Sequence, residues 1–530
     1  MAASMQKITR ICDLCKRKYF VLSPQARLCH ATQRAKKWKS VVGLEIHAQI
    51  NTKSKLFSGA ENKFGGATNS QVALFDAAFP GTLPVINRRC VEAGVLTALA
   101  LKCRINKVSK FDRKHYFYAD LPAGYQITQQ RQPLAVKGHV EYCIKNKNNF
   151  ENKTADITQL QLEQDSGKSL HDETDKLSLI DLNRCGTGLM EIVTEPDFTN
   201  GMDAAAFVRE LQQILQTIKT CDGKMEEGSL RVDANISIHL PGQPYGVRTE
   251  VKNLNSIKSV SKAIDYEVRR QIKILDGGGE IENETRSFDA ESEETLPMRD
   301  KEVKTDYRFM PEPNLPPLCI FDNDTIQSVS NPSNMINIDD VKLQLSPLPE
   351  ETRVRLEQQY DISRSNSMML VDKPDLMVFF EAVMKSTTRN GKQVSNFVIN
   401  TLAGLLNERN LTPSKCPVSA DALGDLMDML QNEEISHTMS VKVALEMLKN
   451  PGTSAVDIVK ENDWYQVNDE TVLNTVSQTI LKENVSMVAK YHKGKTKHLN
   501  KLVEKAVNAS NGNPRLLKKI ITEILHKDEK

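Results

Sequence analysis

A chain of 530 residues is too long for one hydrophobic core, and a typical domain size of about 150 residues predicts two to four domains. Its 39% hydrophobic and 26% charged residues are typical of a soluble globular protein. We expect no membrane insertion, because no apolar run approaches the roughly 18 residues that span a bilayer.

The net charge of +2 is unevenly distributed along the chain. Residues 1–40 contain ten Lys or Arg and a single acid, Asp13, for a net charge of +9, so the remainder carries −7. A basic leader that is nearly free of acid and not strongly apolar is typical of an organellar transit peptide. We therefore predict a mitochondrial transit peptide over residues 1–40 and a matrix location; the alternative is a disordered basic arm that stays attached.

The first predicted element is a strand over residues 41–50, where apolar and polar residues alternate strictly. With a side-chain period of two, Glu45, His47 and Gln49 share one face, and apolar residues occupy the other. Same-face neighbours on a strand lie roughly 6.6 Å apart. A carboxylate and an imidazole held this way could share a small cation or an anionic substrate.

Residues 112–129 interleave basic and aromatic side chains, among them Lys114, Tyr116 and Tyr118. This composition suits a site that stacks on a nucleobase and neutralises phosphate. An aromatic core strand with charged flanks is an equally good interpretation of the residues alone.

Two acidic segments follow. A predicted strand over residues 158–165 directs Glu163 and Asp165 to one face. In the run 179–197, Asn183 and Arg184 precede a glycine turn, and Glu191 stands alone within Leu-Met-Glu-Ile-Val. If Glu191 is buried it must be paired or bound to a metal; the alternative is a strand edge with Glu191 in solvent.

The next predicted elements are two helices and two strands. A helix over residues 203–219, with Asp203 as N-cap, and a helix over 256–275, stopped by Gly277–Gly279, both follow 3.6-residue periodicity. Between them, strands over 231–239 and 246–254 present polar faces, and the residues just before the second helix form an anion site. The polar residues concerned are Arg231, Asp233, Asn235, Lys252, Asn253 and Asn255.

Four prolines at 311, 313, 316 and 317 mark a boundary, and from about residue 340 the pattern is almost wholly helical. The sequence thus predicts an α+β fold: an N-terminal mixed, largely antiparallel sheet cradle with helices, then an all-α C-terminal helical domain and a helical tail. We place the cradle domain at 41–335, a helical linker domain at 336–455 and the tail at 456–530.

The end of the chain is basic, since residues 482–530 carry twelve Lys or Arg against five Asp or Glu. A patch of net charge +7 on an otherwise acidic protein predicts a nucleic-acid footprint. The alternative is a solvated helix surface. The lysines we assign to the footprint are Lys493, Lys495, Lys497, Lys518 and Lys519.

Several of these runs together resemble the B subunits of the aspartyl/glutamyl-tRNA amidotransferases, and the basic leader points to the mitochondrial form. The likeness covers the chain from about residue 40 to its end, where it includes a YqeY-like tRNA-binding tail. The matching runs are 42–49, 113–129, 162–168, 179–197, 225–237, 249–256 and 306–317.

The resemblance implies an enzyme, a glutaminyl-tRNA synthase (glutamine-hydrolysing), that works with ATP and Mg²⁺. Glutamate mischarged on tRNA(Gln) would be activated at its γ-carboxylate, and ammonia from a partner amidase would convert it to glutamine for mitochondrial translation. The implied assembly is a heterotrimer with the amidase, or A, subunit plus a small C subunit. A non-catalytic scaffold that presents charged tRNA to an amidase is the alternative, but a scaffold has no need of an acidic face.

Residue roles also follow from the resemblance. It implies Glu45, His47, Glu191 and one acid of the 162–165 segment as metal ligands, with Asp233 as a further catalytic group. Relatives often have two glutamates where this chain has Glu163 and Gln164, so the acid is either Glu163 or Asp165; we favour Glu163. Contacts to ATP and substrate are assigned to Lys114, Tyr116, Tyr118, Asn183, Arg184, Arg231, Asn235, Lys252, Asn253 and Asn255.

One departure from the family concerns zinc. Bacterial relatives often carry paired cysteines near the segment that here reads 79–84, whereas this chain has Ala77 and Ala78 there. We expect no zinc.

Overall fold

The strict alternation near the start of the chain forms strand β1 (Lys39–Gln49), which lies inside a nine-stranded sheet. The strand order is β14-β13-β12-β11-β1-β10-β7-β6-β2, and every neighbouring pair is antiparallel except β12 and β13. The other strands are β2 (Arg104–Ile105), β6 (Ala135–Asn146), β7 (Asn149–Gln164), β10 (Gly188–Thr194), β11 (Leu230–His239), β12 (Thr249–Lys252), β13 (Thr285–Asp289) and β14 (Glu294–Pro297).

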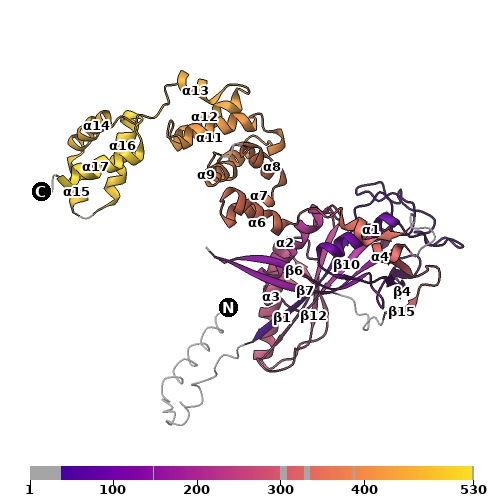
Figure 1. Cartoon of the computed structure of the whole chain (residues 1–530). Coiled ribbons are helices and arrows are strands. Elements are labelled where there is room, and N and C mark those ends of the chain that lie inside the picture. The colour runs from indigo at the N-terminus through magenta and orange to yellow at the C-terminus, as the bar shows by residue number, and fades with distance from the viewer. Residues whose placement is uncertain are drawn as a thin grey trace, which may run out of the picture. The chain divides into compact units, whose positions relative to one another are not determined.

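The structure is a computed structural model that describes residues 38–146, 149–172, 174–298, 307–327, 335–385, 388–493 and 495–527. The predicted transit peptide lies almost wholly outside these residues. The chain divides into two units, residues 1–346 and 347–530 (Figure 1).

One face of the large sheet is the core of the first unit. Leu44 and Ile46 of β1 are fully buried there, and Val232 and Ile236 of β11 are buried beside them. Helix α2 (Gly201–Thr217) packs on β6, α3 (Ile257–Asp276) packs on β11, and α1 (Arg88–Ala100) contacts β6 and β7 (Figure 1). Because the apolar residues of β1 face these helices, its polar residues are left for the opposite face.

The start of α2 corrects one sequence prediction. The N-cap is Asn200, whose side chain accepts a hydrogen bond from the backbone N–H of Asp203, so Asp203 is not the cap. Asp203 is instead buried and accepts hydrogen bonds from Tyr142 Oη at 2.6 Å and Lys153 Nζ at 3.0 Å. Both residues have polar side chains suited to a cap, and the tertiary contacts decide between them.

The other predicted helices and strands differ from those in the structure mainly in length. Helix α3 begins one residue after the predicted start, because Ser256 is its N-cap, and it ends at Asp276 before the glycines. Strand β7 begins nine residues earlier than the predicted 158–165 strand, and the strand predicted over 246–254 is limited to β12. The mostly antiparallel sheet with helices, followed by helices alone, confirms the predicted fold class.

Three smaller sheets complete the described part of the first unit. One has the order β15-β4-β5, one β17-β16-β3, and one pairs β8 with β9. Their strands, with two short helices, are β3 (Val108–Ser109), β4 (Asp112–His115), β5 (Tyr125–Thr128), β8 (Lys168–Asp172), β9 (Leu177–Asp181), β15 (Arg308–Pro311), β16 (Leu318–Phe321), β17 (Ile336–Asn337), α4 (Asn323–Ile326) and α5 (Ile338–Lys342).

The described residues of the second unit are helical and form two hydrophobic cores. One core joins α6 (Pro349–Tyr360), α7 (Arg364–Val371), α8 (Pro374–Val383), α9 (Gly391–Asn396), a π-helical turn (Phe397–Leu402), α10 (Ala403–Asn407), α11 (Ala420–Gln431), α12 (His437–Lys449) and α13 (Ala455–Glu461). The other joins α14 (Glu470–Glu483), α15 (Val485–His492), α16 (Lys497–Ser510) and α17 (Pro514–Lys527). The predicted domain limits at 335 and 455 stay predictions. Among the described helices, none has both the length and the apolarity of a bilayer span.

Candidate active site

The register of the central strands gathers polar side chains on the face of the sheet that the helices leave open. Glu45 stands opposite Asp233 of β11, and His47 stands opposite Glu191 of β10 and Arg231 of β11. Residues directly opposite each other on antiparallel strands project to the same face. Three strands therefore deliver five polar side chains to one place.

Glu45, His47 and Glu191 form a group with the character of a metal site. One ligand atom from each lies within 4.8 Å of the others, and His47 Nε2 is 3.8 Å from Glu45 Oε1. Two carboxylates suit Mg²⁺, which prefers oxygen, and the imidazole also suits Mn²⁺ or another transition metal. The donor set therefore fits a divalent cation.

Glu191 is the most buried member of this group, with 6% of its surface exposed. Burial raises the pKa of its carboxyl well above the usual range, and the charges of Glu163 and Glu45 raise it further. Gln161 Nε2 donates a hydrogen bond to Glu191 Oε2. The alternative of a solvent-exposed Glu191 at a strand edge is wrong, because β10 lies between β1 and β7.

Glu163 and Asp165, the two candidates for the fourth acid, have different surroundings. Glu163 is 2% exposed; its Oε1 lies 3.8 Å from Lys114 Nζ, and its Oε2 has no hydrogen-bond partner among the described residues. Asp165 Oδ2 is already held by Arg231 Nη2 at 2.9 Å and Arg184 Nε at 3.5 Å. Gln164 turns away, and its Oε1 accepts a hydrogen bond from the backbone N–H of Ile127. A buried carboxylate oxygen without a partner favours Glu163 as the acid available to a ligand.

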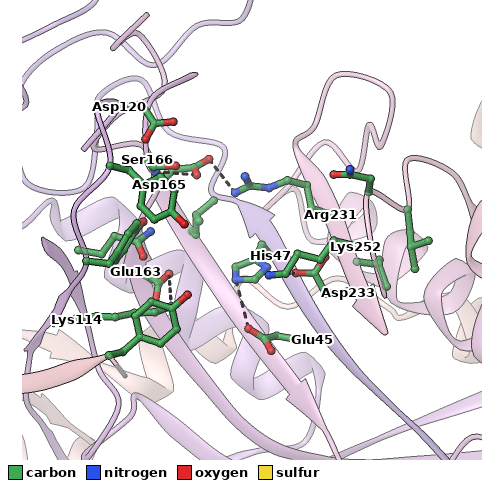
Figure 2. Close-up of a pocket in the computed structure, with 18 of the residues that line it drawn as sticks. Glu45, His47, Lys114, Asp120, Glu163, Asp165, Ser166, Arg231, Asp233 and Lys252 are labelled. Atoms are coloured by element: carbon green, nitrogen blue, oxygen red, sulfur yellow. Dashed lines mark hydrogen bonds and ion pairs between the residues drawn. The ribbon is translucent and has the colours of Figure 1, made fainter. Parts of the chain in front are cut away.

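Cations line the same cavity of about 390 Å³, each beside a carboxylate (Figure 2). Lys252 Nζ is 3.4 Å from Asp233 Oδ2 and 3.3 Å from Glu250 Oε1. Burial alone would lower the pKa of Lys114, but the carboxylates of Glu163, Glu191 and Glu45 outweigh it and raise that pKa. Both lysines are therefore charged at neutral pH.

Aromatic rings form a further wall of the cavity. The ring centroids of Tyr116 and Tyr118 are 5.4 Å apart, those of Tyr116 and Tyr307 are 5.8 Å apart, and Lys114 Nζ lies 5.2 Å from the Tyr307 ring. Tyr307 arrives from a distant part of the chain because β15 pairs with β4. The run 112–129 is therefore part of a site wall as well as of a small sheet.

The structure brings most of the predicted site residues together. The cavity is lined by Glu45, His47, Lys114, Tyr116, Tyr118, Glu163, Arg231, Asp233, Lys252, Asn253 and Asn255.

Three predicted ligand contacts lie elsewhere. Asn183 Nδ2 donates to the Ala67 carbonyl and so holds a loop, while Arg184 donates to the carbonyls of Ser166 and Gly167. Asn235, at the pairing of β11 with β12, does not line the cavity.

Sequence reasoning missed several lining residues, namely Asp120, Gln126, Ser166 and Tyr307. Asp120 and Gln126 belong to the 112–129 run, but only the aromatic and basic residues of that run gave a signal for ligand binding. Tyr307 belongs to the 306–317 run, but no spacing in the sequence indicates its pairing with residues near 115.

The tail lysines lie on a different part of the chain. Lys493 and Lys495 lie between α15 and α16, Lys497 begins α16, and Lys518 and Lys519 lie on α17. All five are exposed. Exposure is what a phosphate-contacting surface requires, although it is also what a solvated helix face shows.

The family model described as "GatB/GatE catalytic domain" matches residues 40–326, and the one described as "GatB domain" matches residues 378–525. The chain is 50% identical over 491 residues to the mitochondrial glutamyl-tRNA(Gln) amidotransferase B subunit of Danio rerio, covering 92% of this chain and 89% of that protein. The human protein of the same description is 49% identical over 94% of this chain and 91% of its own length. An aspartyl/glutamyl-tRNA(Asn/Gln) amidotransferase B subunit from Orientia tsutsugamushi (strain Boryong) is 41% identical over 93% of this chain and 97% of its own.

Proposed function

The chain belongs to the GatB family of amidotransferase B subunits, and we propose that it uses ATP to activate the γ-carboxylate of glutamate mischarged on tRNA(Gln). Transfer of the terminal phosphoryl group to that carboxylate gives an acyl phosphate and ADP. Ammonia then attacks the acyl carbon, phosphate leaves, and a proton is lost, giving Gln-tRNA(Gln). The protein, a component of a ligase, thus forms a carbon–nitrogen bond.

One observation carries this proposal: a cluster of buried and half-buried acids with an imidazole lies at a cavity that is also lined by cations. Phosphoryl transfer depends on positioning and charge neutralisation more than on a covalent protein group. Lys114, Arg231 and Lys252 are the cations that would receive phosphate oxygens. A scaffold that only presents tRNA needs Lys, Arg and aromatic residues, and gains nothing from buried acids.

Glu45, His47 and Glu191 would hold a divalent cation such as Mg²⁺, with Glu163 as the fourth ligand. When bound, the cation would neutralise phosphate and carboxylate charge. Arg184 acts indirectly, since with Arg231 it fixes Asp165, which lines the cavity. The Asp233–Lys252 ion pair forms another part of the cavity lining.

The proposal extends to partners and location. We infer a complex with an amidase, which hydrolyses glutamine to release ammonia, and with a small third protein. The relatives described as mitochondrial and the basic leader at residues 1–40 support import into the mitochondrial matrix. Uptake by isolated mitochondria, with loss of the leader and protection from added protease, tests the location.

The function is tested in the assembled complex with mischarged Glu-tRNA(Gln), glutamine and ATP. We expect conversion to Gln-tRNA(Gln) with matching ADP release, loss of both after chelation, and recovery with Mg²⁺ or Mn²⁺. Glu191→Gln should abolish ADP release while leaving glutamine hydrolysis measurable. If this variant converted Glu-tRNA(Gln) at the wild-type rate, the reaction would take place on a partner protein, and this protein would be a scaffold.

A further inference from the structure

Phe117 is a large aromatic residue that the structure leaves exposed beside the cavity. It is 87% exposed, yet its ring is supported on one side, because it lies against Gly124. A Cβ atom built on Gly124 would lie 3.0 Å from Phe117 Cε1 and 3.1 Å from Cδ1. Gly124 has a φ of +72°, so the position favours glycine for its backbone as well as for the space it leaves to the ring.

The loop that carries Phe117 is tied at several points. Between β4 and β5, Tyr116 N–H donates to the Gly124 carbonyl at 3.1 Å, and Leu121 N–H donates to the Tyr118 carbonyl at 3.0 Å. Gly167 N–H, just beyond β7, donates to the Asp120 carbonyl at 2.9 Å. The ring is therefore presented on a loop braced against the large sheet, and a ligand that binds the ring would order little further backbone.

The position of Phe117 relative to the cavity indicates the size of its ligand. The neighbouring Tyr116 and Tyr118 line the cavity, whereas Phe117 does not. A cavity of about 390 Å³ admits the end of a tRNA carrying glutamate but not the nucleotides that precede it. Those nucleotides must lie outside the cavity, and Phe117 is an exposed ring that stands in the chain between two residues lining it. The exposed Arg308, next to Tyr307 on β15, supplies positive charge on the same small sheet.

We propose that Phe117 is a stacking platform for a nucleobase at the acceptor end of the charged tRNA. This inference rests on the proposed function and adds a positioning contact to it. An exposed ring face binds a nucleobase of any sequence, because every base has a π face. ATP is the other source of a base, but it is small enough to enter the cavity and has no need of a platform outside it.

The test compares Phe117→Ala and Phe117→Tyr in the assembled complex. For Phe117→Ala we expect KM for Glu-tRNA(Gln) to rise roughly tenfold, in line with the loss of one base–aromatic stack. KM for ATP, kcat and glutamine hydrolysis should stay within about twofold of wild type, and Phe117→Tyr should retain tRNA affinity. The matched control is Phe64→Ala, since Phe64 is also exposed, at 70%, but neither of its chain neighbours lines the cavity.

A binding measurement separates this inference from the proposed function. Uncharged tRNA(Gln) is compared with the same tRNA lacking its three terminal nucleotides, in the absence of ATP and glutamine. Wild type and Phe64→Ala should prefer the intact tRNA, and Phe117→Ala should lose most of that preference. Equal preference in all three proteins, or a rise in KM for ATP in place of that for tRNA, would overturn the platform. An inactive wild-type complex that still shows the Phe117-dependent preference would overturn only the proposed reaction.

Discussion

Three carboxylates, those of Glu45, Glu163 and Glu191, lie near one another; Glu163 and Glu191 are buried, and Glu45 is half-buried. Burial, together with the charges of Glu163 and Glu45, raises the pKa of the Glu191 carboxyl well above its usual range. Lys114 offsets part of this charge, and a bound divalent cation would offset more. Without a bound cation, the carboxylate cluster therefore lowers the stability of the folded protein. This is expected of a functional site.

Glu45→Gln and His47→Ala test the metal-bearing strand. Both side chains point away from the packed face of β1, so each change should alter the free energy of unfolding by no more than about 0.5 kcal/mol. Formation of γ-glutamyl phosphate should fall by orders of magnitude, because a ligand or a group that stabilises transition-state charge is lost.

Thermal melting, glutaminase rate and ADP release are measured side by side in the complex. The glutaminase rate serves as the control and should persist at least in part. Near wild-type phosphorylation in both variants would make Glu45 a structural carboxylate.

Among the elements, α2 shows how a buried acid fastens a helix to the sheet. Burial alone would raise the pKa of Asp203, but hydrogen bonds from Tyr142 and Lys153 outweigh it and hold that pKa below the usual range. Tyr142 belongs to β6 and Lys153 to β7, so one carboxylate joins three elements.

Asp203→Asn should therefore destabilise the protein by about 2 kcal/mol at pH 7. A carboxyl with a lowered pKa in the folded state adds stability above its unfolded pKa of about 4, and that stability is lost as the pH falls toward the folded value. Urea unfolding at several pH values gives the difference in free energy of unfolding between wild type and variant. This difference should be constant above about pH 5 and should shrink below about pH 4. A difference in unfolding free energy that does not depend on pH would show that the ionised carboxylate is not the stabilising form. The control is Asp276→Asn, which removes a carboxylate that accepts an exposed hydrogen bond from Trp38.

The elements also show what could be predicted from the chain alone. Alternation identified β1 and β11 nearly to the residue, and with them the shared face of Glu45, His47, Arg231 and Asp233, because a period of two fixes which side chains share a face. Asp203 was misjudged because a capping side chain and a tertiary hydrogen-bonding side chain look alike in sequence. The proximity of Tyr307 to Tyr116 comes from the pairing of β15 with β4, which neither segment encodes by itself.

For the whole molecule, the arrangement of cores changes how the tail should be tested. Ala455, Ile458 and Val459 of α13 belong to the hydrophobic core that starts at α6, so a deletion from residue 456 would damage that core. Substituting exposed lysines leaves both cores intact.

Replacing Lys493, Lys495, Lys497, Lys518 and Lys519 by Ala should weaken tRNA binding and raise KM for Glu-tRNA(Gln). The slope of log K against log salt should become shallower by up to about 4, if each lysine neutralises one phosphate. Ala at the exposed Lys415 and Lys449 is the control. If the tRNA affinity and its salt dependence were unchanged, the tail lysines would be a solvated helix surface and not a tRNA contact.

A second prediction for the whole molecule concerns the division of labour. The chain contains no Ser-Ser-Lys amidase signature in a Gly/Ser-rich stretch, so the purified protein should not hydrolyse glutamine. Ammonium salts should replace glutamine in the conversion of Glu-tRNA(Gln), because only ammonia is needed at this site. Glutamine hydrolysis by the isolated chain would contradict the assignment of ammonia release to a partner.

Strand β1 lies between β10 and β11, and this position affects how the protein unfolds and loses activity on heating. Backbone amides of an interior strand exchange with solvent only when the whole unit opens, whereas edge strands and loops open locally. Glu45 and His47 are therefore carried by one of the slowest-exchanging segments of the chain. Heat should abolish carboxylate activation and the fold at the same temperature, with no intermediate range in which the protein is folded but the cluster has come apart.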